Sequence, residues 1–204
     1  MPPSERAESL LPAPGRGQYD RALTRERRQA EQRERLLAAT AAAFARQHPG
    51  VSGVIELAGV GRNTFYEYFD HYEHALEAVS TRAQARLEAS CRDALERART
   101  PIERLRAVSR GWSTALLETR DDAVVLLCSQ ARAPEQPLSV AGRVLAASYE
   151  SARQVESRGR AQDPALVLAA AASAEIVLLR ALATHADVEA TAVLVAQLAI
   201  RLLH

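Results

Sequence analysis

The sequence has few of the residues that stabilise a fold through disulfide bonds or structural metal ions. Its 204 residues include only two cysteines, Cys91 and Cys128, and neither lies at the spacing of a metal site or a redox pair. No signal peptide precedes the helical patterns, so we expect a reduced, cytoplasmic compartment. The chain also has no lysine, because all 26 of its basic residues are arginine. We attribute that preference to genome composition rather than to a binding role, so it indicates no function by itself.

Sequence patterns of catalysis are also missing. The chain has no glycine-rich phosphate loop, no nucleophile elbow and no convincing pair of carboxylates. His71 and His74 lie three residues apart and can in principle share a metal ion, but the sequence places no third ligand beside them. We therefore expect a protein that is not an enzyme and that needs neither a metal ion nor another cofactor.

Apolar residues recur at helical spacing along most of the chain, and no segment alternates as a strand does. The sequence therefore predicts an all-α fold of about nine helices. Residues 1–20 are rich in proline, have no apolar period and are expected to form a flexible arm. The predicted helices span about 24–48, 52–58, 62–69, 71–99, 101–118, 121–131, 138–157, 164–185 and 188–203.

Several helix starts carry specific signals. Thr100-Pro101-Ile102-Glu103 is a capping box with proline at the first helical position, and Asp163-Pro164 repeats the combination of cap and proline. Asp70 and Asp187 are the expected caps of the helices that follow them. These signals divide the second half of the chain into five separate helices after the long one that ends near residue 99.

Aromatic residues make up only 4% of the chain, but five of its eight Phe and Tyr residues fall in one window. The five are Phe65, Tyr66, Tyr68, Phe69 and Tyr72. The window follows Ala58-Gly59-Val60-Gly61, in which Gly59 can adopt a positive φ and end one helix while Gly61 starts the next. Phe65 and Phe69, four residues apart, can pack inward. This division predicts a short helix whose other face lies in a DNA groove.

The string from Ala58 to Val79, AGVGRNTFYEYFDHYEHALEAV, resembles the DNA-binding domain of the TetR/AcrR family of transcriptional regulators. Upstream, the segment Arg33 to Gln47 resembles that family's first helix. The clear likeness covers about residues 25–79. It implies a helix-turn-helix domain over residues 21–70, followed by a helical effector-binding and dimerisation domain over residues 71–204.

The predicted DNA contacts follow from side-chain chemistry. Arg62 can pair bidentately with guanine, while Asn63 and Thr64 can reach base edges or phosphates. Tyr66 and Tyr68 offer hydroxyl donors to the DNA backbone, and the alternative is that both only complete a small core. The resemblance places Tyr66 at the family's phosphate-contacting tyrosine, and it places a further candidate where a phosphate-binding lysine is frequent: Tyr72.

An arginine-rich stretch precedes and enters the first predicted helix. From Arg21 to Arg35 the chain carries six arginines and three glutamates. A solvated helix face laced with Glu and Arg pairs is the alternative, but the position beside the reading helix favours phosphate binding. The arginines predicted to contact phosphate are Arg21, Arg25, Arg27 and Arg28.

Some residues depart from the family pattern. Ile55 stands where a small residue is usual, and Gly61 replaces a common serine. The connection before the second helix is about three residues shorter than usual and lacks the polar segment that normally caps that helix. Glu67, Asp70 and Glu73 make the third-helix region acidic, which opposes phosphate binding. The alternative function is therefore a helical ligand-binding or protein-interaction dimer with a degenerate reading helix; a small helical enzyme is the weakest alternative.

The resemblance also implies a small-molecule effector site in the larger domain. The expected lining residues, each of which can also be ordinary core, are Trp112, Leu116, Cys128, Tyr149 and Glu175. The last two predicted helices are apolar nearly all round, which predicts a homodimer built through them. Glu175 and Arg180 argue against a membrane span there. We expect a cytoplasmic homodimeric repressor that leaves a palindromic operator when a small apolar effector binds.

Overall fold

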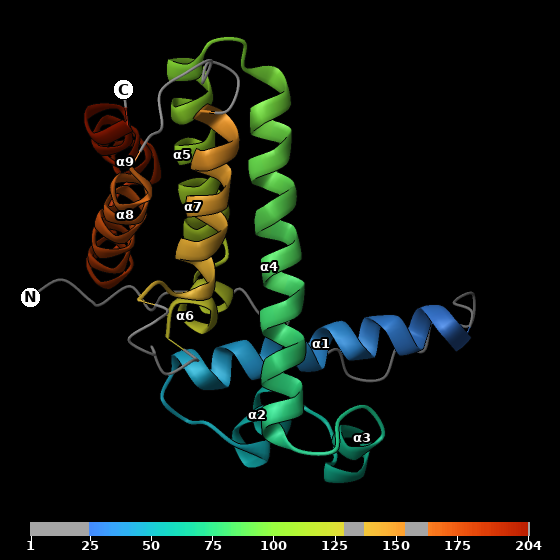
Figure 1. The fold of residues 1–204 in the computed structure, drawn as a ribbon. Helices are drawn as coiled ribbons and strands as arrows, with labels where there is room; N and C mark the ends of the chain where they lie inside the picture. Colours follow the sequence, from blue (N-terminus) through green and yellow to red (C-terminus); the bar gives the residue numbers. More distant parts are fainter. Residues whose placement is uncertain (1–24, 129–136, 154–162, 204) are drawn as a thin grey trace, which may run out of the picture. The chain divides into compact units, whose positions relative to one another are not determined.

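The computed structural model describes residues 25–128, 137–153 and 163–203. Within these ranges it contains nine α-helices and no strand, which confirms the predicted fold class (Figure 1). The predicted arm, Arg21, Gly159 and the Pro134 side of the predicted loop lie outside the described residues. The helices are α1 (Arg25–Ala45), α2 (Val51–Ala58), α3 (Arg62–Tyr66), α4 (Tyr72–Arg97), α5 (Pro101–Glu118), α6 (Arg120–Cys128), α7 (Val140–Arg153), α8 (Pro164–Thr184) and α9 (Val188–Leu203).

The chain divides into two compact units, and the division falls inside α4, between Ala75 and Leu76. The first unit holds α1, α2, α3 and the first residues of α4. Its core is made by one face of α1 together with apolar residues of the following two helices, and Leu36, Val54 and Phe65 are completely buried in it. The second unit holds the remainder of α4 and the helices α5 to α9.

The turn between α2 and α3 has the predicted conformation. Gly59 ends α2 with a φ of 65° and a ψ of 38°, in the left-handed region that a residue without a Cβ adopts most easily. The backbone N–H of Val60 then bonds to the carbonyl oxygen of Ile55 at 3.2 Å, which closes the helix end in a Schellman arrangement. Gly61 follows as the N-cap of α3, and no side chain caps that helix.

The end of the first helix and the start of the fourth helix differ from the prediction. The backbone conformation ends the first helix, and the side chain next to the predicted cap begins the fourth. The first helix ends at Ala45 rather than near His48, since Gln47 adopts a φ of 57° and closes a left-handed cap. At the start of α4, the predicted cap was Asp70. The structure instead has His71 at the N-cap, where its Nδ1 accepts a hydrogen bond from the backbone N–H of His74 at 3.1 Å.

Two other helices have a boundary that differs from the prediction. The third helix ends at Tyr66 rather than Phe69, because the N–H of Tyr68 bonds back only three residues, to the carbonyl of Phe65, and the chain tightens into a turn. The seventh helix begins at Val140, directly after Ser139, rather than at about residue 138. The predicted ends of the sixth and seventh helices, at about residues 131 and 157, lie outside the described residues.

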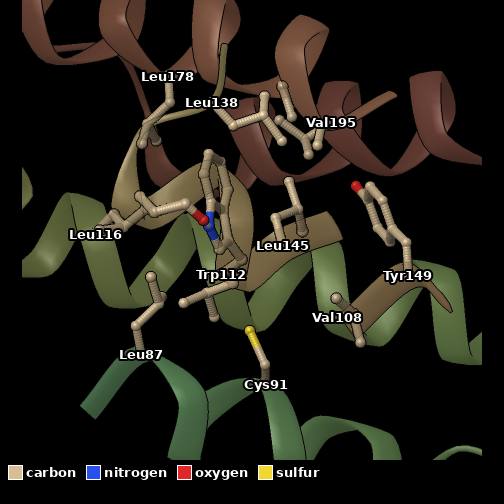
Figure 2. Close-up of a cluster of buried hydrophobic side chains, with 14 of the residues drawn as sticks. Leu87, Cys91, Val108, Trp112, Leu116, Leu138, Leu145, Tyr149, Leu178 and Val195 are labelled. Atoms are coloured by element: carbon tan, nitrogen blue, oxygen red, sulfur yellow. Dashed lines mark hydrogen bonds between the residues drawn. The ribbon is translucent and has the colours of Figure 1, made fainter. Parts of the chain in front are cut away.

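The second unit has one continuous core. Its helix α5 packs closely against α9 and α7, and α8 packs against α7 and α9. Figure 2 shows Trp112 of α5 at the centre of this core, among Leu87 of α4, Leu145 of α7 and Leu178 of α8. Because every one of these four side chains is almost completely buried, the packing fixes how the helices of this unit lie against one another.

The remaining caps are as predicted. Thr100 and Glu103 form a complete capping box at the start of α5, and Asp163 with Pro164 begins α8. The backbone N–H of Ala190 bonds to the carboxylate of Asp187 at 2.8 Å, so this aspartate caps α9. These ends depend on residues close together in the chain.

Gly53, near the start of α2, provides a test of the first unit. An added Cβ there would overlap the backbone carbonyl oxygen of His48, whereas a Cβ at Gly61 would meet no atom within 4 Å. We expect Gly53→Ser to destabilise the first unit by about 1–3 kcal/mol through overpacking. The matched change Gly61→Ser should stabilise it by roughly a few tenths of a kcal/mol, since serine is a good N-cap. Native-state hydrogen exchange of the α1–α3 amides measures both; equal protection in the two variants would contradict the close approach.

Candidate functional site

The outer face of α3 carries the residues predicted to read DNA. Arg62, Asn63 and Tyr66 are exposed, and Thr64 is half-buried. Tyr66 leaves 49% of its surface accessible, which is unusual for an aromatic side chain in the first unit. The structure therefore brings these four candidates together at one short helix, directly after the left-handed turn at Gly59.

The inner face of α3 is held by aromatic packing. Phe65 and Phe69 are buried as predicted, and their ring centroids lie 5.7 Å apart. The ring of Tyr66 meets Phe65 edge-on at 5.5 Å, so this tyrosine is anchored on one side and exposed on the other. The ring of His74 meets Phe69 edge-on at 5.6 Å, and the guanidinium of Arg33 lies 5.8 Å from the Phe69 centroid. The helix α3 is thus positioned by residues from both α1 and α4.

Two of the predicted tyrosines are less accessible. Tyr68 is half-buried. The hydroxyl oxygen of Tyr72 is buried and has no hydrogen-bond partner among the described residues, and its pKa is raised by burial and by the nearby Glu73. This placement does not support a phosphate contact by Tyr72.

The surface of the first unit carries charges of both signs. Arg25, Arg27 and Arg28 are exposed on the first turn of α1, and Arg27 pairs with Glu31 at 3.3 Å. Glu67, Asp70 and Glu73 are also exposed, so the acidity of this region is present at the surface.

The two histidines at the start of α4 lie against these acids. His74 Nδ1 is 3.3 Å from the Asp70 carboxylate, and His71 Nδ1 is 3.4 Å from that of Glu73. Across the described part of the chain, no group of three His, Cys, Asp or Glu side chains is arranged to hold a metal ion.

Three of the predicted effector-site residues lie together in the core of the second unit. Trp112 is completely buried and donates its indole N–H to the carbonyl of Ala141 at 2.9 Å. Tyr149 lies 2.9 Å from the hydroxyl of Ser109, and burial raises the pKa of Tyr149 well above its usual range. Leu116 is packed in the same cluster. Polar atoms of both aromatic side chains thus have internal partners, as satisfied core residues do.

The other two predicted lining residues lie elsewhere. Cys128 is exposed at the end of α6. Glu175 of α8 is buried, and its carboxylate accepts hydrogen bonds from both the backbone N–H and the hydroxyl of Ser139, at the N-terminus of α7. A Cβ at Gly142 would overlap this carboxylate. Glu175 therefore acts as a buried cap that joins α8 to α7, a role that depends on a partner far away in the sequence.

A surface groove of about 600 Å³ lies between α4 and α5, and none of the predicted effector-site residues lines it. Its lining includes Ala94 and Arg97 of α4 and Arg106 and Gly111 of α5. Small residues recur on the facing sides of the two helices, which is the sequence signal that marks this groove.

Exposed apolar side chains gather on the last two helices. Of the six large exposed apolar residues in the described part of the chain, Tyr66 belongs to α3 and the other five belong to α8 and α9: Leu166, Leu168, Ile176, Val193 and Leu194. By length and composition alone, α8 is also apolar enough to cross a membrane, as core helices often are. Its Glu175 is bonded to α7, so α8 is an integral part of the second unit.

Comparisons with known proteins identify the fold. No protein-family model and no curated protein sequence matches the chain. Among solved structures, a TetR-like transcriptional regulator from Rhodococcus sp. RHA1 is 20% identical, with a TM-score of 0.69 over 88% of this chain and 97% of that one. The fatty acid degradation regulator FadR from Bacillus halodurans is 16% identical, with a TM-score of 0.68 over 82% of this chain and 94% of that one.

A third similar structure contains a ligand. It is the transcriptional regulator FadR from Bacillus subtilis in complex with stearoyl-CoA, which is 17% identical and covers 84% of this chain and 99% of that one, with a TM-score of 0.66. These likenesses extend over both units. They confirm, for the fold, the family resemblance that the sequence around the aromatic window carries. The chain has the fold of the TetR-family transcriptional regulators.

Proposed function

We propose that the chain is a cytoplasmic, homodimeric transcriptional regulator that represses by binding a palindromic operator. The observation that supports this most directly is the surface of α3. Arg62 and Asn63 are exposed on a helix that Phe65 and Phe69 hold from behind, directly after a left-handed turn. Solved structures with this fold are transcriptional regulators, which agrees with a helix that enters the major groove.

Recognition would combine contacts to base edges with contacts to phosphates. Arg62 has the geometry to bind guanine, with Asn63 and Thr64 beside it, while Tyr66 reaches the backbone. In a symmetric dimer two such helices meet half-sites about 34–36 Å apart, one helical turn of DNA, or at a multiple of that distance. Because acidic residues near α3 oppose phosphate binding, most of the electrostatic affinity for DNA would come from the arginines of the first turn of α1.

Release would be a population shift driven by a small apolar effector in the second unit. The helix α4 belongs to both units, so its position is the physical link between effector and DNA contacts. Arg82 of α4 holds Asp122 of α6 through two hydrogen bonds of 2.8 and 3.1 Å, and Arg86 lies 3.7 Å from the same carboxylate. An effector that favours another arrangement of α4 needs a coupling free energy of only about 1–3 kcal/mol.

The first test is selection of genomic DNA fragments by the purified protein. We expect one inverted repeat to be enriched. Arg62→Ala should weaken binding to that repeat by about 1–3 kcal/mol and relax the preference at one position, because alanine cannot form the bidentate hydrogen bonds to a base. The control is Arg92→Ala, which removes an exposed arginine of α4 in the second unit and should leave the affinity unchanged. No enrichment by the unmodified protein at modest salt would favour the degenerate ligand-binding module instead.

The arginine stretch is tested by the salt dependence of DNA binding. Replacing Arg21, Arg25, Arg27 and Arg28 by Ala should flatten the slope of log affinity against log salt by a few units at most, about 0.9 for each phosphate that is no longer neutralised. Affinity titrations between low and physiological salt give this slope. A slope equal to that of the unmodified protein would refute the assignment of phosphate binding to this stretch.

The dimer is proposed to form through α8 and α9, whose exposed apolar side chains are not covered by other residues that the structure describes. Ile176 leaves 69% of its surface accessible, and Leu166 and Leu168 lie in the same half of the α8 circumference at 100° per residue. Burying this face in a symmetric contact removes it from water.

We expect Ile176→Glu to weaken the dimer at least roughly tenfold, because an unpaired carboxylate would be buried in the contact. Sedimentation velocity over a range of concentrations measures the association of the 22.2 kDa chains. Ala85→Glu, an exposed change on α4, is the matched control. If both variants associate as the unmodified chain does, the contact lies on another face.

A further inference from the structure

The groove between α4 and α5 has the chemistry of a binding site. The two helices are joined by the short connection from Ala98 to Thr100 and run side by side in opposite directions, as Figure 1 shows. They approach closely at Gly111, whose carbonyl oxygen accepts a hydrogen bond from the hydroxyl of Ser90 at 3.2 Å. Beyond this point the facing side chains are small, with Ala94 on α4 and Ala107 on α5, so neither helix fills the space of about 600 Å³.

The arginines at the rim of this groove differ in whether a carboxylate forms an ion pair with them. Arg110 pairs with Glu189 of α9 at 2.7 Å. Arg97 and Arg106 line the same groove, and neither has an ion-pair partner within 4 Å among the residues that the structure describes. Arg106 also lies four residues before Arg110 on the same helix face, where two like charges repel each other. A bound anion would relieve this repulsion.

The acidic residues of the lining do not form ion pairs with these two arginines. The carboxylate of Glu103 accepts the backbone N–H groups of Arg99 and Thr100 at 3.0 and 3.2 Å, and these bonds lower its pKa. One oxygen of this carboxylate is therefore bonded to the N-terminus of α5, and Glu103 forms no ion pair with an arginine of the groove. Asp93 is the remaining acid of the lining, so three arginines and two acids line the groove.

We propose that this groove binds a small organic anion, with its carboxylate, sulfonate or phosphate group on Arg97 and Arg106 and a compact apolar body over the small residues of the floor. Planar guanidinium groups suit such anions because they donate paired hydrogen bonds. The floor formed by Ala94, Ala107 and Gly111 accepts a flat apolar group. If the proposed regulation holds, this ligand contacts α4, the helix that also reaches the first unit.

The probe for this site is 1-anilinonaphthalene-8-sulfonate, which carries a sulfonate on an apolar ring system and fluoresces when it is removed from water. Titration into the DNA-free protein should show saturable binding, and the double variant Arg97→Ala/Arg106→Ala should raise its Kd roughly tenfold or more because the charge-assisted hydrogen bonds are absent. The matched control Arg92→Ala/Arg99→Ala removes two exposed arginines outside the lining and should leave the Kd within about twofold.

A second variant tests the apolar body of the ligand. Ala107→Trp should fill the groove floor and abolish the arginine-dependent binding, while circular dichroism checks that the helices are retained. Octanoate should displace the probe, and neutral 1-octanol should do so at least roughly tenfold less effectively, because only the former offers an anion to the arginines. Equal Kd values for the unmodified protein, the double arginine variant and the filled variant would overturn the proposal and place the probe on another surface, such as α8 and α9.

Because no DNA is present in these titrations, their outcome is independent of operator recognition. Binding at the groove by a protein that selects no DNA would refute the regulator and leave the site intact. Operator binding together with arginine-independent probe binding would do the reverse.

Discussion

The proposed DNA-contacting surface of α3 depends on the burial of two phenylalanines. A helix of five residues, such as α3, has no stability of its own in water, because too few hydrogen bonds repay the ordering of its first turn. Phe65 and Phe69 hold it against the first unit, and Arg33 and His74 pack on the Phe69 ring from α1 and α4. The position of Arg62 and its neighbours is therefore decided by packing behind the helix rather than by the helix itself.

The features that the sequence predicted correctly depend on residues close together in the chain. The left-handed end at Gly59, the capping box from Thr100 to Glu103 and the cap at Asp187 all involve partners within five residues. The inward and outward faces of α3 follow from helical spacing in the same way. The all-α fold and the order of its helices can therefore be predicted from the sequence, since nearly every helix carries its own start or stop signal.

The features that the sequence could not place depend on partners elsewhere. The role of Glu175 follows from Ser139 on another helix, and the burial of the Tyr72 hydroxyl follows from tertiary packing that no local pattern specifies. Trp112 and Tyr149 are predicted lining residues, yet large aromatic side chains equally suit the middle of a core, where both lie. The α4–α5 groove arises where two stretches of small residues face each other, and the pairing of those stretches appears only once the helices are packed.

The contact between α8 and α7 limits how the second unit can move. The Glu175 carboxylate is bonded to the first residue before α7, and Gly142 leaves room for it with no space for even a methyl group. Sliding α8 along α7 would pull a buried charge away from its donors, whereas a tilt about this point keeps them together. In such a tilt the contact is the pivot, so the residues next to Glu175 move least and the two ends of α8 move most.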